Sequence, residues 1–389
     1  MNHALMQTYA RQDISFESGA GAWLTATGGE RYLDALSGIS VCNLGHANPA
    51  VHKAISAQSQ KLLHTSNLYR IPLQEQLAEE LTRLTGMSAV FFANSGAEAN
   101  EAAIKICRKR AATEGLTAPL IVTMQGGFHG RTLATLTASG NDKIKTGFAP
   151  LLPGFAHVPY NDAEALQALL ADNDQVTAVM LEAIQGEGGV VVPDAGYLSA
   201  VRRLCDDHNC LLVLDEIQTG LCRTGDWLAC HDEQVQPDIV TLAKSLGNGM
   251  PIGACLVDQK LREVLQAGDH GSTFGGNPLA ASAALAVLHT LQAQQLPERV
   301  RQLGERMLAG FRQRLAGHAV VQDIRGRGLM LGIELNQPCG ELVEQALAQH
   351  LLINVTADKV IRLLPPFIIT DEEADSIVDI VSGLIESLN

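Results

Sequence analysis

Apolar and polar positions alternate between about residues 46 and 257 in a way that predicts strands and helices in turn. Short continuous apolar runs, bounded by glycines and polar turn residues, are typical of buried strands. Strands that are each followed by a helix-length segment favour an α/β domain, in which helices cover the faces of a sheet. The predicted strands are Ala89–Ala93, Leu120–Met124, Thr177–Leu181, Leu211–Leu214, Ile239–Leu242 and Gly253–Val257.

The two ends of the chain carry a different pattern. Residues 1–45 hold short β-like pieces between glycine turns, too small to bury a core alone. The C-terminal part begins with a long Ala/Leu-rich helix from Ala280 and ends with a helix that opens on the capping box Thr370-x-x-Glu373. We therefore predict an N-terminal segment (1–45) that packs with a small C-terminal domain (276–389), and a large domain (46–275) between them.

Composition narrows the range of partners. The chain has 389 residues, of which 46% are hydrophobic, so it is long enough for two domains and a large core. Its formal net charge of −14 and its lack of basic runs argue against nucleic acid or an anionic membrane as a partner. The N-terminus lacks the pattern of a secretory signal, and no apolar run approaches the length of a membrane span. These features predict a cytoplasmic protein that acts on small molecules.

The cysteines do not indicate a metal site. All eight lack the spacing of a disulfide framework, which favours a reduced compartment. Some of them cluster with histidines, but no pair has the Cys-x-x-Cys spacing of a zinc site, and we interpret them as buried free thiols. The clustered residues are Cys205, His208, Cys210, Cys222, Cys230 and His231.

Asp215 and Lys244 are the strongest candidates for chemistry. Asp215 stands at the end of an apolar run, and the carboxyl ends of strands are where open α/β sheets bind ligands. A buried carboxylate needs a cationic or hydrogen-bonding partner, and a protonated pyridine nitrogen would serve. Pyridoxal phosphate has such a nitrogen and also needs a lysine, and Lys244 ends the next apolar run. The alternative is a solvated Asp at a strand end and an ordinary surface lysine.

A second motif predicts a phosphate site. Ser95-x-x-Glu98 is a capping box that opens a helix directly after the Ala89–Ala93 strand. Gly96 allows close approach of a ligand, and a helix N-terminus presents free N–H groups to an anion. We expect a phosphate on the Ser95 hydroxyl and on the N–H groups of Gly96 and Ala97. The alternative is an ordinary capped helix.

The stretch Asp215-Glu-Ile-Gln-Thr-Gly220, followed by Lys244 in Ala-Lys-Ser-Leu-Gly-Asn-Gly, resembles the signature of the class III (ornithine-type) aminotransferases. The resemblance extends over nearly the whole chain. It implies the fold type I of pyridoxal-phosphate-dependent transferases, with a large domain built on a mostly parallel sheet and a smaller α+β domain. It also implies a homodimer with shared active sites.

The resemblance assigns roles around the cofactor. Phe128 would lie flat on the pyridine ring with Ile217 on the opposite face, and Gln218 would bind near the ring hydroxyl. Glu216 belongs to the same signature and is expected among the cofactor-binding residues. Thr273 would reach the cofactor phosphate of a neighbouring subunit.

The resemblance also assigns the substrate-binding residues. Arg131 would hold a substrate carboxylate through its planar fork, unless it is an ordinary solvated arginine. Ser272 would lie near the substrate. Glu187 would pair with Arg362 and mask it while the amino donor is bound, then leave Arg362 free for 2-oxoglutarate; the alternative is a simple salt bridge between domains.

Further segments resemble family members that act on acetylated ornithine. They imply transfer of the δ-amino group of N2-acetylornithine to 2-oxoglutarate, a step of arginine biosynthesis. Succinylornithine, ornithine, succinyl-diaminopimelate and 4-aminobutyrate stay open as donors, because few pocket residues decide among them. An aminomutase or a decarboxylase, and a non-catalytic protein on the same fold, are the more distant alternatives. These segments are Ser37–His46, His64–Tyr69, Phe148–Phe155 and Leu352–Thr356.

Overall fold

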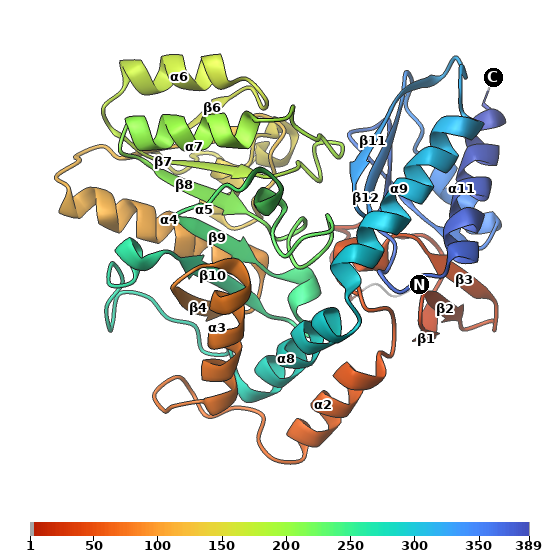
Figure 1. The fold of residues 1–389 in the computed structure, drawn as a ribbon, viewed down its shortest axis with the longest axis horizontal. Helices are drawn as coiled ribbons and strands as arrows, with labels where there is room; N and C mark the ends of the chain where they lie inside the picture. Colours follow the sequence, from red (N-terminus) through yellow and green to blue (C-terminus); the bar gives the residue numbers. More distant parts are fainter. Residues whose placement is uncertain (1–3, 389) are drawn as a thin grey trace.

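The structure is a computed structural model that describes residues 4–388, and three sheets organise it (Figure 1). The largest has seven strands in the order β4-β10-β9-β8-β7-β5-β6, and the other two have four strands each, in the orders β1-β2-β3-β13 and β11-β12-β15-β14. The strands of the large sheet are β4 (Ala89–Ala93), β5 (Leu120–Met124), β6 (Phe155–Val158), β7 (Val176–Glu182), β8 (Leu211–Asp215), β9 (Ile239–Leu242) and β10 (Gly253–Val257).

The large sheet confirms the predicted α/β architecture. Every predicted strand is present, and all neighbours pair in parallel except β10, which runs antiparallel to both β4 and β9. The edge strand β6 was not predicted. Its residues are mostly half-buried, so the sequence lacks the continuous apolar run that marks the inner strands.

Helices on both faces explain why those runs are continuous. In β8, Leu211 and Val213 pack into the core that includes the apolar face of α4 (Gly96–Thr113), whereas Leu212 and Leu214 pack into the core on the opposite face. A strand buried on both sides needs no polar positions. The other helices of this region are α2 (Pro49–Ser59), α3 (Pro72–Thr85), α5 (Leu133–Ala138), α6 (Ala163–Asp172), α7 (Tyr197–Asp207) and α8 (Pro278–Ala293).

The start of α4 follows the capping prediction with one difference. The Ser95 hydroxyl accepts a hydrogen bond from the Glu98 N–H (3.2 Å). The Glu98 carboxylate, however, accepts from the N–H of Asn94 (2.6 Å), one residue before the cap. The helix end is therefore fixed while the N–H groups of Gly96 and Ala97 stay available, because neither is used by the cap.

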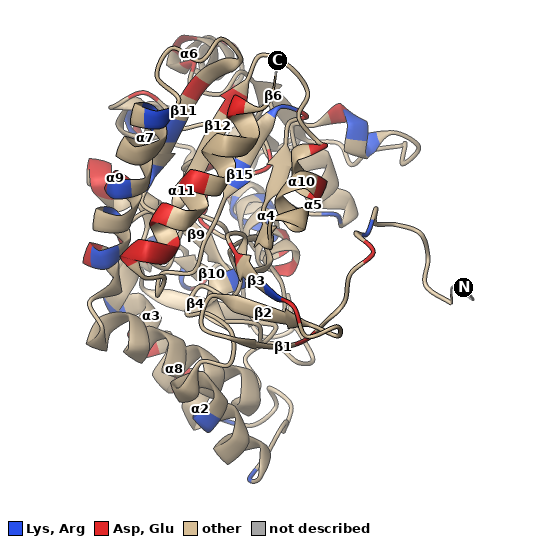
Figure 2. Ribbon diagram, turned by 90° about the vertical axis from the view of Figure 1, so that its right-hand side faces the viewer, with Lys and Arg blue, Asp and Glu red and all other residues tan. Residues whose placement is uncertain are grey.

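The C-terminal part forms a separate antiparallel sheet with charged helices packed on it. Figure 2 shows acidic and basic residues along α9 (Leu296–Arg314), acidic residues along α11 (Asp371–Glu386), and few charged residues on α2 and α8. The predicted capping box of the last helix is present, with Thr370 and Glu373 bonding reciprocally. The remaining elements are β11 (Val321–Arg327), β12 (Met330–Leu335), α10 (Leu342–Ala348), β14 (Asn354–Thr356) and β15 (Val360–Leu363).

The N-terminal strands share a sheet with this C-terminal part. β3 (Arg31–Asp34) pairs in parallel with β13 (Leu351–Leu352), and the Trp23 indole N–H donates to the Glu373 carboxylate (2.6 Å). The sheet is completed by β1 (Phe16–Ala20) and β2 (Trp23–Ala26), and the short helical turn α1 (Ser37–Ser40) follows it. In the part of the chain from residue 4 to 388, no helix is long and apolar enough to cross a bilayer.

The α8 helix lies closer to the large sheet's helices than our domain division implies. It packs along α2 and α3 and makes few contacts with α9, the first helix that packs on the C-terminal sheet. The predicted boundary near residue 276 stays a prediction, and these contacts favour a boundary between α8 and α9.

Arg223 joins three regions of the chain through a fully buried guanidinium group. Its Nε donates to the Ser40 hydroxyl (2.9 Å), and a terminal nitrogen donates to the carbonyls of Leu329 and Pro365 (both 2.8 Å). The other terminal nitrogen donates to the Asn43 side chain. All the acceptors in these bonds are neutral, and they come from the N-terminal segment and from the C-terminal part. The side chain therefore fixes the junction beside the cavity described below.

We expect Arg223→Met to destabilise the protein by about 3 kcal/mol, because the buried acceptors around it lose their donors. The measurement is the shift of the urea unfolding midpoint. Arg312→Met, at an exposed position on α9, is the matched control and should shift stability by no more than about 0.5 kcal/mol. Equal midpoints for the two variants would show that the buried guanidinium does not hold the junction.

Candidate active site

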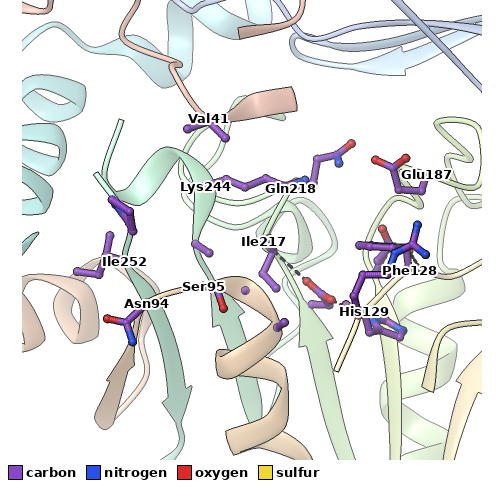
Figure 3. A pocket seen from close by; sticks show the side chains of 18 of the residues that line it. Val41, Asn94, Ser95, Phe128, His129, Glu187, Ile217, Gln218, Lys244 and Ile252 are labelled. Carbon is purple, nitrogen blue, oxygen red and sulfur yellow. Dashed lines mark hydrogen bonds and ion pairs between the residues drawn. The ribbon is translucent and has the colours of Figure 1, made fainter. Parts of the chain in front are cut away.

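A cavity of about 490 Å³ opens at the carboxyl ends of the parallel strands of the large sheet (Figure 3). Residues that follow β4, β5, β7, β8 and β9 line it, as expected for a doubly wound sheet. The structure brings ten of the predicted residues together there. They are Ser95, Gly96, Ala97, Phe128, Arg131, Glu187, Asp215, Ile217, Gln218 and Lys244.

Asp215 is buried at the end of β8 and held on both carboxylate oxygens. Oδ1 accepts from the N–H of Ile217 (3.1 Å), and Oδ2 accepts from the side-chain amide of Asn100 (2.8 Å). Nδ1 of His129 also lies 2.8 Å from Oδ2. Thr241 in turn donates to the other end of the Asn100 amide (2.7 Å). These hydrogen bonds stabilise the carboxylate and offset the free-energy cost of removing it from water.

Asn100 and His129 are the residues that sequence reasoning missed. His129 lines the cavity, and its Nε2 is buried without a hydrogen-bond partner among the described residues. Burial lowers the pKa of His129, yet the bond to Asp215 outweighs it and leaves the pKa above its usual value. The signal for Asn100 was a lone amide on the alanine-rich buried face of α4, because such a group needs a partner.

Lys244 extends from the turn after β9 toward Gln218 (Figure 3). Its backbone φ of 44° is uncommon for a residue with a side chain, which indicates that the surroundings fix its position. Burial, with the positive charge of Arg362 as the next cause, lowers the pKa of Lys244 to about 8. A larger fraction of this amine is therefore neutral near pH 7 than for a solvated lysine.

Glu187 and Arg362 form the predicted ion pair. The guanidinium Nη1 lies 2.6 Å from the Glu187 carboxylate and 3.4 Å from Oε1 of Gln218. The Arg362 side chain is 0% exposed and that of Glu187 is 36% exposed, so Glu187 covers the arginine from the cavity side. Burial raises the pKa of Glu187, but the attraction of Arg362 outweighs it and keeps the pKa below its usual value.

A third acid, Glu182, lines the cavity next to Phe128. Its carboxylate accepts from the N–H groups of Phe128 (3.0 Å) and Gly186 (3.1 Å). Burial raises the pKa of Glu182 to about 7. Its contacts hold the turn that carries Phe128 and the turn that leads to Glu187, so we interpret Glu182 as a support for both.

Three predicted residues lie outside the cavity lining besides Arg362. The Glu216 carboxylate is buried and turned away, where it accepts from the N–H of Cys230 (3.0 Å) and from the Thr219 hydroxyl, so the structure does not bring it to the cofactor position. The Ser272 hydroxyl accepts from the amide of Asn94, a cavity residue (3.1 Å). Thr273 is exposed, next in sequence to Ser272.

Comparison with known proteins identifies the chain. The family model described as aminotransferase class-III matches residues 6–385. The chain belongs to the class-III aminotransferases. It is therefore a pyridoxal-phosphate-dependent transaminase, as the sequence predicted.

This class-III aminotransferase resembles named proteins both in sequence and in structure. An acetylornithine aminotransferase of Nitrosomonas europaea is 51% identical over 385 residues, which cover 99% of this chain and 98% of the relative. The N-acetylornithine aminotransferase structure from Stenotrophomonas maltophilia has a TM-score of 0.85 at 38% identity and covers 97% of each chain. An ornithine aminotransferase structure from Toxoplasma gondii, with partial occupancy of PLP at its active site, has a TM-score of 0.96 at 35% identity and covers 99% of this chain and 92% of that one.

The residues of this class-III aminotransferase fit pyridoxal phosphate. A Cβ at Gly96 would lie 2.6 Å from the Ile217 side chain, so only glycine leaves room beside that residue at the helix N-terminus. Free N–H groups there suit a phosphate, and the ionised Asp215 suits a protonated ring nitrogen. Phe128 and Ile217 line the same cavity and offer apolar surfaces for the ring.

The perturbed lysine gives a pH-dependent prediction. Only the neutral amine reacts with an aldehyde, so the rate at which cofactor-free protein takes up pyridoxal phosphate should rise with pH through about 8. Arg362→Met removes a positive charge near Lys244, which raises the pKa of Lys244 and moves the curve to higher pH. The absorbance of bound cofactor, followed in time between pH 6 and pH 10 (roughly two units on either side of that value), measures the rate.

The control for this experiment is Arg262→Met, an exposed arginine outside the cavity, which should leave the pH curve unchanged. A curve for Arg362→Met that stays in place or moves to lower pH would contradict the electrostatic coupling.

Proposed function

We propose that this enzyme transfers the δ-amino group of N2-acetylornithine to 2-oxoglutarate, giving N-acetylglutamate 5-semialdehyde and glutamate, a step of arginine biosynthesis. One observation supports the chemistry. Lys244 has a lowered pKa and faces the same cavity as Asp215, a buried carboxylate with three hydrogen-bond partners. The choice of donor is supported by relatives named acetylornithine aminotransferase that are 44–51% identical over nearly the full chain.

Asp215, Ser95 and Lys244 divide the work of holding the cofactor and moving the proton. Bound pyridoxal phosphate supplies an electron sink for the pair left when the substrate proton departs. Asp215 would keep a proton on the ring nitrogen, and Ser95 with the N–H groups of Gly96 and Ala97 would hold the phosphate. Phe128 and Ile217 would hold the ring, and Gln218 would bind near the ring hydroxyl. Lys244 would supply the amine for the cofactor aldehyde and would serve as the general base that moves the proton.

Arg131 and Arg362 divide the recognition of carboxylates. Arg131 lies at the cavity with its guanidinium carbon 5.6 Å from the centre of the Phe128 ring, where it can hold the carboxylate of the donor. Arg362 is reserved for the second carboxylate of 2-oxoglutarate, and Glu187 covers it while the donor is bound. The pair at 2.6 Å corresponds to the covered state.

Two observations favour an acylated donor over free ornithine. The acids that line the cavity are Glu182, Glu187 and Asp215, and each already has a hydrogen-bond partner. The cationic α-amino group of ornithine would need one of them as a counter-ion, and binding to Glu187 would break its ion pair with Arg362. An acyl group is neutral and has no such need. A second hollow of about 910 Å³ shares Phe128, Arg131 and Glu187 with the cavity and extends to Val355, which gives the acyl group space.

Steady-state kinetics with four donors at equal concentration tests the assignment. We expect kcat/KM for N2-acetylornithine to exceed that for ornithine and 4-aminobutyrate by at least about tenfold, because a mismatched polar group costs 1.4 kcal/mol or more. Succinylornithine measures tolerance for a larger acyl group. Lys244→Ala should lose at least about a thousandfold in turnover with every donor.

A higher value for 4-aminobutyrate or ornithine would move the assignment to another ω-amino donor. Undiminished turnover by Lys244→Ala would overturn the role of Lys244 itself.

We also propose that the enzyme is a homodimer with shared active sites. Large apolar side chains are exposed on the loop 62–69 and beside Thr273, which is unusual unless a partner covers them. The loop is tied to that segment by the Asn67 amide, which donates to the carbonyls of Ser272 and Gly275 (both 3.1 Å). The exposed side chains are Leu62 (45%), Leu63 (52%), Leu68 (85%), Tyr69 (70%) and Phe274 (59%).

Complementation tests the shared site. We expect Thr273→Ala and Lys244→Ala each to be weakly active as homodimers, whereas a mixed dimer, isolated with two affinity tags, regains about half of the wild-type activity, because one of its two sites is complete. A mixed dimer that is no more active than its parents would show that each chain uses its own Thr273.

The domain division and the location in the cell remain proposals of the same kind. We propose a large cofactor-binding domain and a small C-terminal domain with the N-terminal segment packed on it, because β3 and β13 share a sheet. A cytoplasmic location is supported by the eight unbridged cysteines.

A further inference from the structure

The short strand β14 touches both members of the Glu187–Arg362 pair. β14 runs antiparallel to β15 with Asn354 directly opposite Arg362. Side chains that face each other across such a pair lie close enough to interact. Here Oδ1 of Asn354 accepts a hydrogen bond from Nε of Arg362 (2.9 Å), while the Asn354 amide nitrogen donates to the carbonyl of Val355 (3.4 Å). The amide is therefore held in one orientation by its own strand.

This contact decides which edge of the guanidinium remains for a ligand. A carboxylate binds Arg in a bidentate manner either through Nε and one terminal nitrogen or through the two terminal nitrogens. With Nε bound to Asn354, the edge of Nη1 and Nη2 is the one left. Nη1 is engaged by Glu187 and Gln218, and Nη2 is buried without a partner among residues 4–388.

The two members of the pair are held unequally. The Glu187 backbone is fixed, because its carbonyl accepts from the Thr356 hydroxyl (2.5 Å), and Arg325 donates to the carbonyls of Gly189 (2.6 Å) and Val190 (2.8 Å). Among residues 4–388, the Glu187 side chain has one ion-pair partner, Arg362, with Gln218 as a further hydrogen-bonding group, and it is 36% exposed. When the pair opens, Glu187 is the side chain that moves, and Arg362 keeps its place on Asn354.

We propose that Asn354 is a positioning residue for the acceptor half-reaction: it fixes Arg362 so that the Nη1–Nη2 edge receives the distal carboxylate of a dicarboxylate acceptor. This proposal rests on the proposed function, in which Arg362 binds 2-oxoglutarate. Asn354 lines neither the cavity nor the second hollow. It acts through Arg362, and it should therefore matter for the acceptor and little for the donor.

The test compares Asn354→Leu with wild type in the two half-reactions. We expect KM for 2-oxoglutarate to rise about tenfold, because the guanidinium is no longer held with its terminal edge toward the cavity, while KM for N2-acetylornithine changes less than about twofold. Glutarate has two carboxylates and no reactive carbonyl. Its dissociation constant, measured by calorimetry on the holoenzyme, should also rise about tenfold and does not depend on which donor the enzyme uses.

Asn336→Leu is the matched control, because Asn336 lies just after β12 on the C-terminal sheet and its amide donates to the Ala319 carbonyl, not to a member of the pair. Both KM values and the glutarate constant should stay as in wild type. Asn354→Ser, which shortens the side chain without adding apolar bulk, takes the place of Asn354→Leu if that variant does not accumulate.

Arg362→Met separates failure of the proposal from failure of the proposed function. If Arg362→Met leaves glutarate binding unchanged, Arg362 does not bind the acceptor. That result would overturn both the role of Asn354 and the role of Arg362 in the proposed function. If Arg362→Met weakens glutarate binding but Asn354→Leu and Asn354→Ser do not, only the role of Asn354 is overturned. An equal rise of KM for donor and acceptor in the Asn354 variants would overturn it as well, since that is the result of a merely structural change.

Discussion

The buried carboxylate of Asp215 is the constraint around which this protein is organised. A charge at the end of the central strand β8 is tolerated only if each oxygen is bonded, and the partners come from different elements. Asn100 is supplied by α4, His129 by the turn after β5, and an N–H by Ile217. The same groups fix the floor of the cavity. The contacts that stabilise the buried carboxylate are therefore also the contacts that would hold it in place for a protonated pyridine nitrogen.

Two buried arginines show how differently a cation can be accommodated. Arg223 donates to neutral oxygens on three sides and has no place for a further ligand, so it acts as a structural junction between the N-terminal segment and the C-terminal part. Arg362 is buried as deeply, but within residues 4–388 one of its terminal nitrogens has no hydrogen-bond partner and the other is bound to a partly exposed carboxylate. An arginine with an incomplete set of acceptors is suited to binding an anion.

The comparisons with known proteins show that similarity of the backbone does not indicate which amino donor an enzyme uses. The Toxoplasma ornithine aminotransferase superposes with a TM-score of 0.96, above the 0.85 of the Stenotrophomonas N-acetylornithine aminotransferase, although its identity is lower (35% against 38%). A TM-score measures the path of the backbone. The choice among ω-amino donors depends on the charge and size of a few side chains near Glu187 and Arg131, which a superposition does not weigh.

The sequence by itself determined six of the seven strands of the large sheet and ten of the residues that line the cavity. Strands covered on both faces leave continuous apolar runs, and Asp215, Lys244 and Ser95 stand where those runs end, so local pattern was sufficient. Only the tertiary structure decided which distant groups meet. Nothing local indicated that Asn100 and His129 would bind Asp215, that Glu216 would turn away, or that Asn354 would hold Arg362. Those contacts join residues far apart in the chain, and packing of the whole fold sets them.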